Sequence, residues 1–200
     1  MLVIASGCYH PALISPEPMR AGDLALGLAG TVIPRRDLPV GTLTIQGRVG
    51  LGHGWDTGLR LTIPSGPYAD IKWNFLARPF LLTADLGGFY QSVAEDDMTE
   101  HYISDTLAYG VCPALLVGTK TAYVGIRASV RRGFGHRMTS GTVGWSTSPS
   151  FLIGASFGDR IRIMPVSELI WSDNTAYFYV GLNLEGHLRP REESAFEADW

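Results

Sequence analysis

Apolar side chains alternate with small or polar ones along most of the chain. In the segment 23–32, leucine or valine occupies most even positions, and small residues occupy most odd positions. The segments 41–52 and 177–185 show the same alternation. A period of two residues is that of a β-strand whose two faces lie in different environments. The pattern therefore predicts strands that are apolar on one face only.

The alternation recurs in successive segments separated by Gly, Pro, Asp and Asn, which favour turns. The expected strands are 23–33, 41–52, 57–64, 68–77, 80–92, 105–118, 122–132, 142–157, 160–172 and 175–188. Tight connections alternate with longer polar ones such as 34–40, 93–104 and 133–141. We predict an all-β fold, a single antiparallel up-and-down β-barrel of about 10 strands (8–10). The barrel is expected over 23–188, after a signal remnant and flexible tether (1–22) and before a polar tail (189–200).

The distribution of charge predicts which face of the barrel wall is polar and which contacts lipid. The polar face is rich in Gly, Ala, Ser and Thr, and between the ends of the expected strands the apolar face carries no Lys, Arg, Asp or Glu. A lysine or arginine facing lipid costs ~2–4 kcal/mol at the membrane midplane, so a bilayer would impose this exclusion. The pattern therefore favours a transmembrane barrel with its apolar face outward.

Aromatic residues give a second indication of a membrane. Several fall near the ends of strands that lead into the longer connections, where a lipid–water boundary would lie. They are Tyr68, Tyr90, Tyr109, Trp145, Trp171 and Phe178. Trp73 is placed at mid-strand and does not fit this girdle.

Charges of both signs occupy the face that would point into the lumen. They include Arg48, Arg60, Lys72, Asp85, Arg127, Arg162, Glu168 and Glu185. An unpaired ion in a narrow interior costs several kcal/mol, so these groups must find partners. We predict an internal network of ion pairs, centred on Asp85 and Glu185, that plugs the barrel.

Three prolines inside expected strands conflict with regular pairing. Pro113, Pro149 and Pro165 each remove one hydrogen-bond donor, and a closed barrel has no edge on which to place the loss. We expect bulges at these positions, with a slip in the alternation of 161–172 near Pro165.

Composition is consistent with this architecture. The chain has 200 residues, enough for one domain, with 46% hydrophobic and 18% charged residues and 24 glycines. No apolar run approaches the ~20 residues of a transmembrane helix, so membrane insertion would use strands. The net charge of −3, without a basic run, argues against nucleic-acid binding.

The search for a catalytic or metal site identifies no motif. His101 lies in an acidic segment, 95–100, and His136 lies in a loop with Ser140. The acidic segment lacks the glycine-turned pattern of a calcium loop. We therefore expect no catalytic residue, no metal and no cofactor.

Two segments resemble known signals. Residues 5–8, Ala-Ser-Gly-Cys, resemble the lipobox of bacterial lipoproteins, with Ala5 at the usual leucine position, which implies acylation of Cys8. In the last strand, Tyr179, Gly181 and Leu184 match the pattern read by the barrel-assembly machinery. Gly186 occupies its final hydrophobic position.

The pattern over 23–188 resembles the small outer-membrane β-barrel proteins of Gram-negative bacteria, the class of the outer-membrane protein A transmembrane domain. The resemblance implies a monomer in the outer membrane with both termini in the periplasm. Its partners would be outer-membrane lipids, lipopolysaccharide and the assembly machinery. A structural or binding role follows, with at most a narrow pore and no enzymatic activity.

Two alternatives remain at the level of sequence. In the first, the chain is a soluble, lipid-anchored, lipocalin-like barrel that carries an apolar ligand. Its cavity would be lined by Leu24, Leu43, Ile71, Val124 and Phe151. In the second, the barrel is a rim enzyme acting on lipid or peptide, with His101 or His136 beside a carboxylate or hydroxyl.

The lipobox resemblance makes a direct prediction about Cys8. If the coding region extends upstream with a basic and apolar leader, Cys8 becomes the acylated N-terminus of the mature protein. Metabolic labelling with a radioactive fatty acid should then label the protein, and Cys8→Ser should abolish the label. Label that persists in Cys8→Ser, or is absent from both proteins, would remove the anchor.

Overall fold

A computed structural model describes residues 15–33, 40–63, 65–76, 79–97, 102–135, 145–172 and 175–188; for some of these, including 92–97 and 102–107, it describes only the backbone. The strands are β1 (Leu24–Ile33), β2 (Val40–Gly52), β3 (Trp55–Ile63), β4 (Gly66–Asn74), β5 (Leu81–Asp97), β6 (Tyr102–Gly118), β7 (Ala122–Gly135), β8 (Trp145–Ala155), β9 (Ile161–Ser172) and β10 (Thr175–His187). No helix among these residues is long and apolar enough to cross a bilayer.

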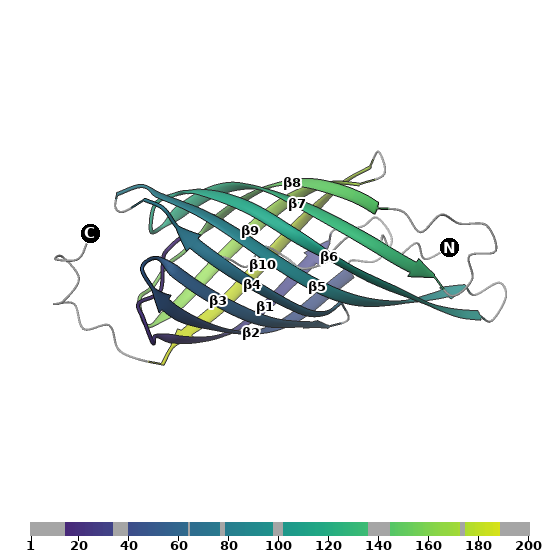
Figure 1. The fold of residues 1–200 in the computed structure, drawn as a ribbon, viewed down its shortest axis with the longest axis horizontal. Helices are drawn as coiled ribbons and strands as arrows, with labels where there is room; N and C mark the ends of the chain where they lie inside the picture. Colours follow the sequence, from purple (N-terminus) through teal and green to yellow (C-terminus); the bar gives the residue numbers. More distant parts are fainter. Residues whose placement is uncertain are drawn as a thin grey trace.

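The ten strands close into one antiparallel barrel (Figure 1). Each strand pairs with its neighbours in sequence, and β1 completes the ring by pairing with β10 from Ala25↔His187 to Val32↔Val180. The predicted fold class is confirmed. Because closure pairs the first strand with the last, no described strand is left as an edge that could recruit another chain.

The apolar face of the alternation points outward, and the charged face points into the barrel. Leu28 is 54% exposed and Ile126 is 60% exposed, whereas Arg60 is 2% exposed. The lipocalin-like alternative is therefore wrong, since its cavity residues all lie on the outside: Leu24, Leu43, Ile71, Val124 and Phe151. An exterior this apolar over every strand is typical of a barrel surrounded by lipid.

Exposed aromatic side chains gather near both ends of the barrel wall. Five of the six predicted girdle residues are exposed toward the longer-loop end: Tyr90, Tyr109, Trp145, Trp171 and Phe178. At the short-turn end, Trp55 stacks on Trp73 with ring centroids 5.1 Å apart, and Phe75 packs against Trp73 at 4.0 Å. Trp73 is therefore part of a second girdle and was wrongly placed at mid-strand.

The three prolines do not produce bulges. Pro113 pairs with Leu86, Pro149 with Ala128 and Pro165 with Leu182, each without a shift of register. Toward the other neighbouring strand the ladder is interrupted: β6 and β7 are unpaired at Cys112 and Pro113, and β8 pairs with β9 only over Ser150–Gly154, short of Pro149 and Pro165. All three side chains are exposed on the outer face. A missing donor removes one hydrogen bond without inserting a residue, so the alternation need not change. The residues of β9 accordingly alternate without the predicted slip, with Arg162, Met164, Val166, Glu168 and Ile170 inward.

The hairpin of β5 and β6 extends farther than predicted. The segment 93–104, expected as a loop, is mostly paired backbone, from Val93↔Thr106 to Asp97↔Tyr102. Figure 1 shows this hairpin projecting beyond the neighbouring strands at the longer-loop end. Antiparallel strands can continue their ladder outside the membrane-facing belt because the ladder satisfies the backbone groups itself.

The outward apolar belt predicts a depth-dependent cost for charge on β1. Leu28→Arg, near the middle of the strand, should lower the free energy of unfolding in lipid vesicles by ~2–4 kcal/mol, and Leu24→Arg, at the strand end, by ~0–1 kcal/mol. Urea unfolding followed by tryptophan fluorescence would measure both. Equal, negligible effects would indicate that this face is in water.

Candidate functional site

The eight charged residues predicted to face the lumen are all buried, each with 2–6% of its surface exposed. They come from strands around the whole barrel: Arg48 (β2), Arg60 (β3), Lys72 (β4), Asp85 (β5), Arg127 (β7), Arg162 and Glu168 (β9), and Glu185 (β10). Regular alternation places them inside, because each shares the parity of small or polar neighbours on its strand.

The main cluster of ion pairs runs across β2, β3 and β4. The carboxylate of Asp70 forms ion pairs with Arg48 Nη1, at 2.8 Å, and with Arg60 Nη2, at 2.5 Å. Asp56 pairs with Arg48 and with Lys72 Nζ, the latter at 2.9 Å. Five alternating charges thus form one continuous chain, in which each carboxylate serves two cations.

A glycine makes room for this cluster. Gly58 lies between Arg48 and Asp70 in the register. A Cβ at Gly58 would lie 2.7 Å from Arg48 Nη1 and 3.1 Å from Asp70 Oδ1. The absent side chain is therefore what allows the guanidinium to reach the carboxylate of Asp70 across β3.

The predicted centre of the network was wrong. Both carboxylate oxygens of Asp85 lack a hydrogen-bond partner among the described residues. Glu185 contacts His187 Nε2 at 3.2 Å and accepts a hydrogen bond from Gln46 Nε2 at 3.4 Å. Asp85 lies opposite Lys72 in the register, but the Lys72 ammonium points to Asp56 instead. Asp56 and Asp70 share the parity of Lys72, and this was the signal that sequence reasoning missed.

A smaller cluster occupies the wall formed by β7, β8 and β9. Arg127 Nη1 lies 3.5 Å from Glu168 Oε1, and Ser150 Oγ donates to the same oxygen at 2.6 Å. The register places Arg127 opposite Ser150. Together the two clusters neutralise most of the cations that the strands direct inward.

Tyr68 lies between these two clusters and not in the aromatic girdle. It is 1% exposed, on the same parity as Asp70 and Lys72. Arg60 stacks over its ring at 4.7 Å and Arg127 lies 6.0 Å from the ring centroid. The ring fits because Gly87 has no side chain, since a Cβ there would overlap Tyr68. The girdle assignment of Tyr68 was wrong because its parity points inward.

Part of the expected tether, residues 15–19, lies inside the short-turn mouth of the barrel. Figure 1 shows these first residues, in purple, at the end where the short turns lie. Ser15, Pro16 and Glu17 are buried, and Arg162 Nη2 lies 2.5 Å from Glu17 Oε2. Sequence reasoning treated this segment as flexible, since nothing in its composition distinguishes a docked proline-rich segment from a free one.

Other predicted residues lie outside the described part of the chain. These are Cys8, His101, His136, Ser140 and the tail 189–200, and the side chains of 95–97 are likewise not described. Cys112 is a buried cysteine that is not part of a disulfide. Among the described residues, no group of three or more His, Cys, Asp or Glu could hold a metal ion.

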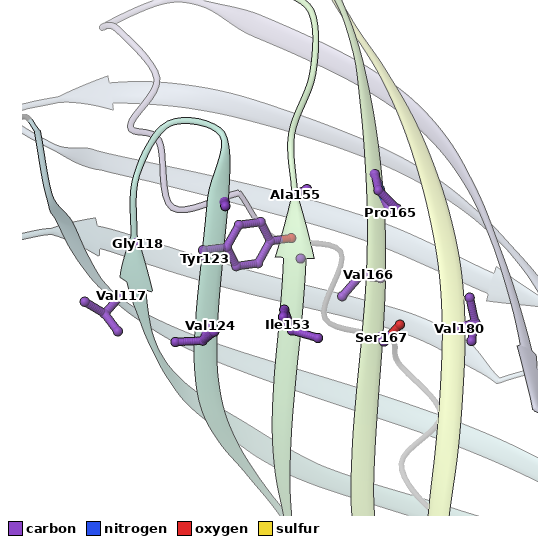
Figure 2. Close-up of a pocket in the computed structure, with 12 residues that line it drawn as sticks. Val117, Gly118, Tyr123, Val124, Ile153, Ala155, Pro165, Val166, Ser167 and Val180 are labelled. Atoms are coloured by element: carbon purple, nitrogen blue, oxygen red, sulfur yellow. The ribbon is translucent and has the colours of Figure 1, made fainter.

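An open hollow of about 520 Å³ lies in the outer wall across β6 to β10 (Figure 2). Small residues create it, among them Gly118, Ala122, Gly154 and Ala155. Val124 and Ile153 border the hollow and are exposed on the lipid-facing side. The surface of the hollow is mainly apolar.

No protein-family model matches the sequence, and no curated protein sequence matches it. Solved structures of similar fold include Neisserial surface protein A, at 11% identity and a TM-score of 0.39 over 82% of this chain and 94% of that one. The NanC porin aligns at 8% identity and a TM-score of 0.43, over 83% of this chain and 99% of that one. The outer membrane protein Ail of Yersinia pestis aligns at 11% identity and a TM-score of 0.40, over 83% of this chain and 99% of that one. Likeness at this level says nothing about the role of this chain.

The class of protein follows from the chain itself. A closed antiparallel barrel with an even number of strands, an apolar aromatic-rimmed exterior and a polar interior is the architecture of outer-membrane β-barrel proteins. The site that distinguishes this barrel is its charged interior, together with the segment docked in its mouth.

Asp70 on β4 and Asp85 on β5 are equally buried carboxylates, so substitutions at these two positions give a matched test of the ion pairs. Asp70→Asn leaves Arg48 and Arg60 without their shared partner and should cost about 3–5 kcal/mol of unfolding free energy. Asp85→Asn removes an equally buried charge that makes no ion pair among the described residues, and should cost much less. Urea unfolding in vesicles measures both, and equal losses would contradict the assignment of partners.

Proposed function

We propose that this protein is a closed outer-membrane barrel with a structural or binding role, without a wide pore and without enzymatic activity. The observation that carries the proposal is the filled interior. Ion pairs line the lumen from β2 through β4 and from β7 through β9, with the Tyr68 ring between Arg60 and Arg127. Barrels of about eight strands are just filled by their side chains, and ten strands add little room.

The short-turn mouth supports the same proposal. Lys72 Nζ donates to the carbonyl oxygens of Ser15 and Glu17 at 2.8 and 2.9 Å. The docked segment therefore occupies space that an open channel would need. A solute entering from this end would meet the segment first and the ion pairs behind it.

The orientation of the barrel belongs to the proposal. β1 begins and β10 ends at the short-turn end, and short turns face the periplasm in barrels of this class. Residues 23 and 188 would then lie on the periplasmic side, and an acylated Cys8 could insert into the inner leaflet nearby. The resemblance of the sequence pattern over 23–188 to the class of the outer-membrane protein A transmembrane domain is part of the same proposal.

At the opposite rim, a basic side chain lies where lipopolysaccharide headgroups would be. The Arg132 guanidinium carbon lies 6.0 Å from the ring centroid of Trp145, which is exposed. Arginine beside an interfacial aromatic residue suits contact with anionic headgroups. We propose lipopolysaccharide and membrane lipids as partners, a monomeric state, and assembly by the barrel-assembly machinery.

Conductance in planar bilayers tests the closed lumen. The unmodified protein should show no large, stable, porin-like channel. Tyr68→Ala should raise the leak by removing the ring between two arginines, whereas Tyr90→Ala, on the outer face of β5, should leave it unchanged. A wide, stable conductance of the unmodified protein would overturn the proposal.

A further inference from the structure

We propose that the short-turn mouth is a peptide-binding site. Its resident ligand is this chain's own Ser15–Glu17, and it takes a bent peptide of the same chemistry, a Ser-Pro-acidic motif, in trans. The proposal concerns recognition and not conductance, so it can fail or succeed independently of the closed lumen.

Three consecutive carbonyl groups of the segment are held by side chains of the wall. Lys72 Nζ donates to Ser15 O at 2.8 Å and to Glu17 O at 2.9 Å. The carbonyl between them, Pro16 O, accepts from Asn74 Nδ2 at 2.5 Å and from Thr83 Oγ1 at 2.9 Å. These hydrogen bonds are made to the backbone of the ligand, so they do not depend on the identity of its side chains.

The fourth contact recognises a charge. Arg162 Nη2 lies 2.5 Å from Glu17 Oε2, and both side chains are 5% exposed. Charge-assisted hydrogen bonds are stronger than neutral ones, and arginine is suited to carboxylates. An acidic residue at this place in the ligand is therefore the main source of side-chain specificity.

The wall residues that contact the segment are hydrogen-bond donors, and the segment supplies the acceptors. Lys72, Asn74, Thr83 and Arg162 are each 0–5% exposed, and all present donors to the mouth. Proline suits the central place because it needs no partner for a backbone N–H. Serine suits the first place because its hydroxyl accepts the Glu17 backbone N–H at 3.2 Å, which fixes the bend of the ligand.

A glycine on β2 admits the following residues of the segment. A Cβ at Gly50 would overlap the backbone of Arg20 and lie 2.9 Å from Met19 Cβ. Gly50 also exchanges backbone hydrogen bonds with the segment, donating to Asp23 O at 2.9 Å and accepting from Gly22 N at 2.8 Å. The close approach shows that the wall accommodates the segment over Met19–Asp23 as well.

The first test measures whether the segment leaves when its contacts are removed. In the full chain with Cys8→Ser, a thiol placed by Ser15→Cys reports on the mouth. The backbone acceptor for Lys72 remains in this reporter, and the sulfur takes the place of the hydroxyl as a weaker acceptor for the Glu17 N–H. Buried Cys112 reports on global unfolding. Glu17→Arg should speed maleimide labelling at position 15 by at least about tenfold, while Cys112 stays unlabelled.

Two further variants distinguish loss of docking from a general disturbance of the fold. The charge swap Glu17→Arg with Arg162→Glu should restore slow labelling. Gly50→Ala displaces the segment sterically with all charges intact, and should also speed labelling. Its control, Gly47→Ala on the same strand, places a Cβ in ordinary contact, 3.5 Å from Leu26 Cδ2, and should change nothing.

The second test measures recognition in trans. A dye-labelled peptide with the sequence of residues 11–20 should bind the full-length Glu17→Arg or Gly50→Ala protein saturably, as measured by fluorescence anisotropy. A peptide carrying Glu17→Gln should bind at least about tenfold more weakly. Thr83→Val in the barrel, which removes one donor to Pro16 O, should also weaken binding.

Two results would overturn the proposal. Labelling at position 15 that stays slow in both displacement variants would show that these contacts do not hold the segment. Rapid labelling without saturable peptide binding, or equal binding of a scrambled peptide, would show that the mouth does not recognise the ligand in trans.

Discussion

Neutralisation of charge inside a lipid-surrounded wall is the constraint on which the rest of this structure depends. Away from its ends, every described strand is apolar on its outer face, so the ionisable residues of that stretch point inward, where an unpaired ion is costly. The solution is cross-strand pairing, most clearly in the chain of contacts Lys72–Asp56–Arg48–Asp70–Arg60. Gly58 and Gly87 follow from the same constraint, because each leaves space for an inward side chain that could not otherwise reach its partner.

The buried charges of the barrel wall nearly balance one another, so the docked segment is not needed to neutralise them. Among the strand side chains that the structure describes, the buried cations, Arg48, Arg60, Lys72, Arg127 and Arg162, are equal in number to the buried acids, Asp56, Asp70, Asp85, Glu168 and Glu185. Glu17 adds an acid to this balanced set and takes Arg162 as its partner. Glu185, directly opposite Arg162 in the register, contacts His187 and Gln46 instead. The segment is thus integrated into the interior by exchanging partners and not by filling an unmet charge.

Sequence alone predicted the closed barrel, its strands and the inward charges, because a period of two residues fixes which face a side chain occupies. It misplaced Tyr68, although the parity shared with Lys72 pointed inward, because aromatic residues at strand ends were taken for the girdle. It also centred the ion pairs on Asp85 and Glu185. Parity says which side chains share the lumen, but register and side-chain reach decide which of them touch. The docking of Ser15–Glu17 had no local signal, since it depends on donors from β4, β5 and β9 that meet only after closure.

The orientation of the wall is the central claim, and site-directed spin labelling along β1 tests it most directly. Single nitroxides at successive positions from Leu24 to Val32, in protein reconstituted into lipid vesicles, would be compared for collisions with oxygen, which concentrates in lipid. The structure predicts high oxygen accessibility at Leu26, Leu28 and Val32 and low accessibility at Gly27 and Ala29. Reversed parity, or accessibility to a water-soluble nickel complex at Leu26 and Leu28, would contradict it.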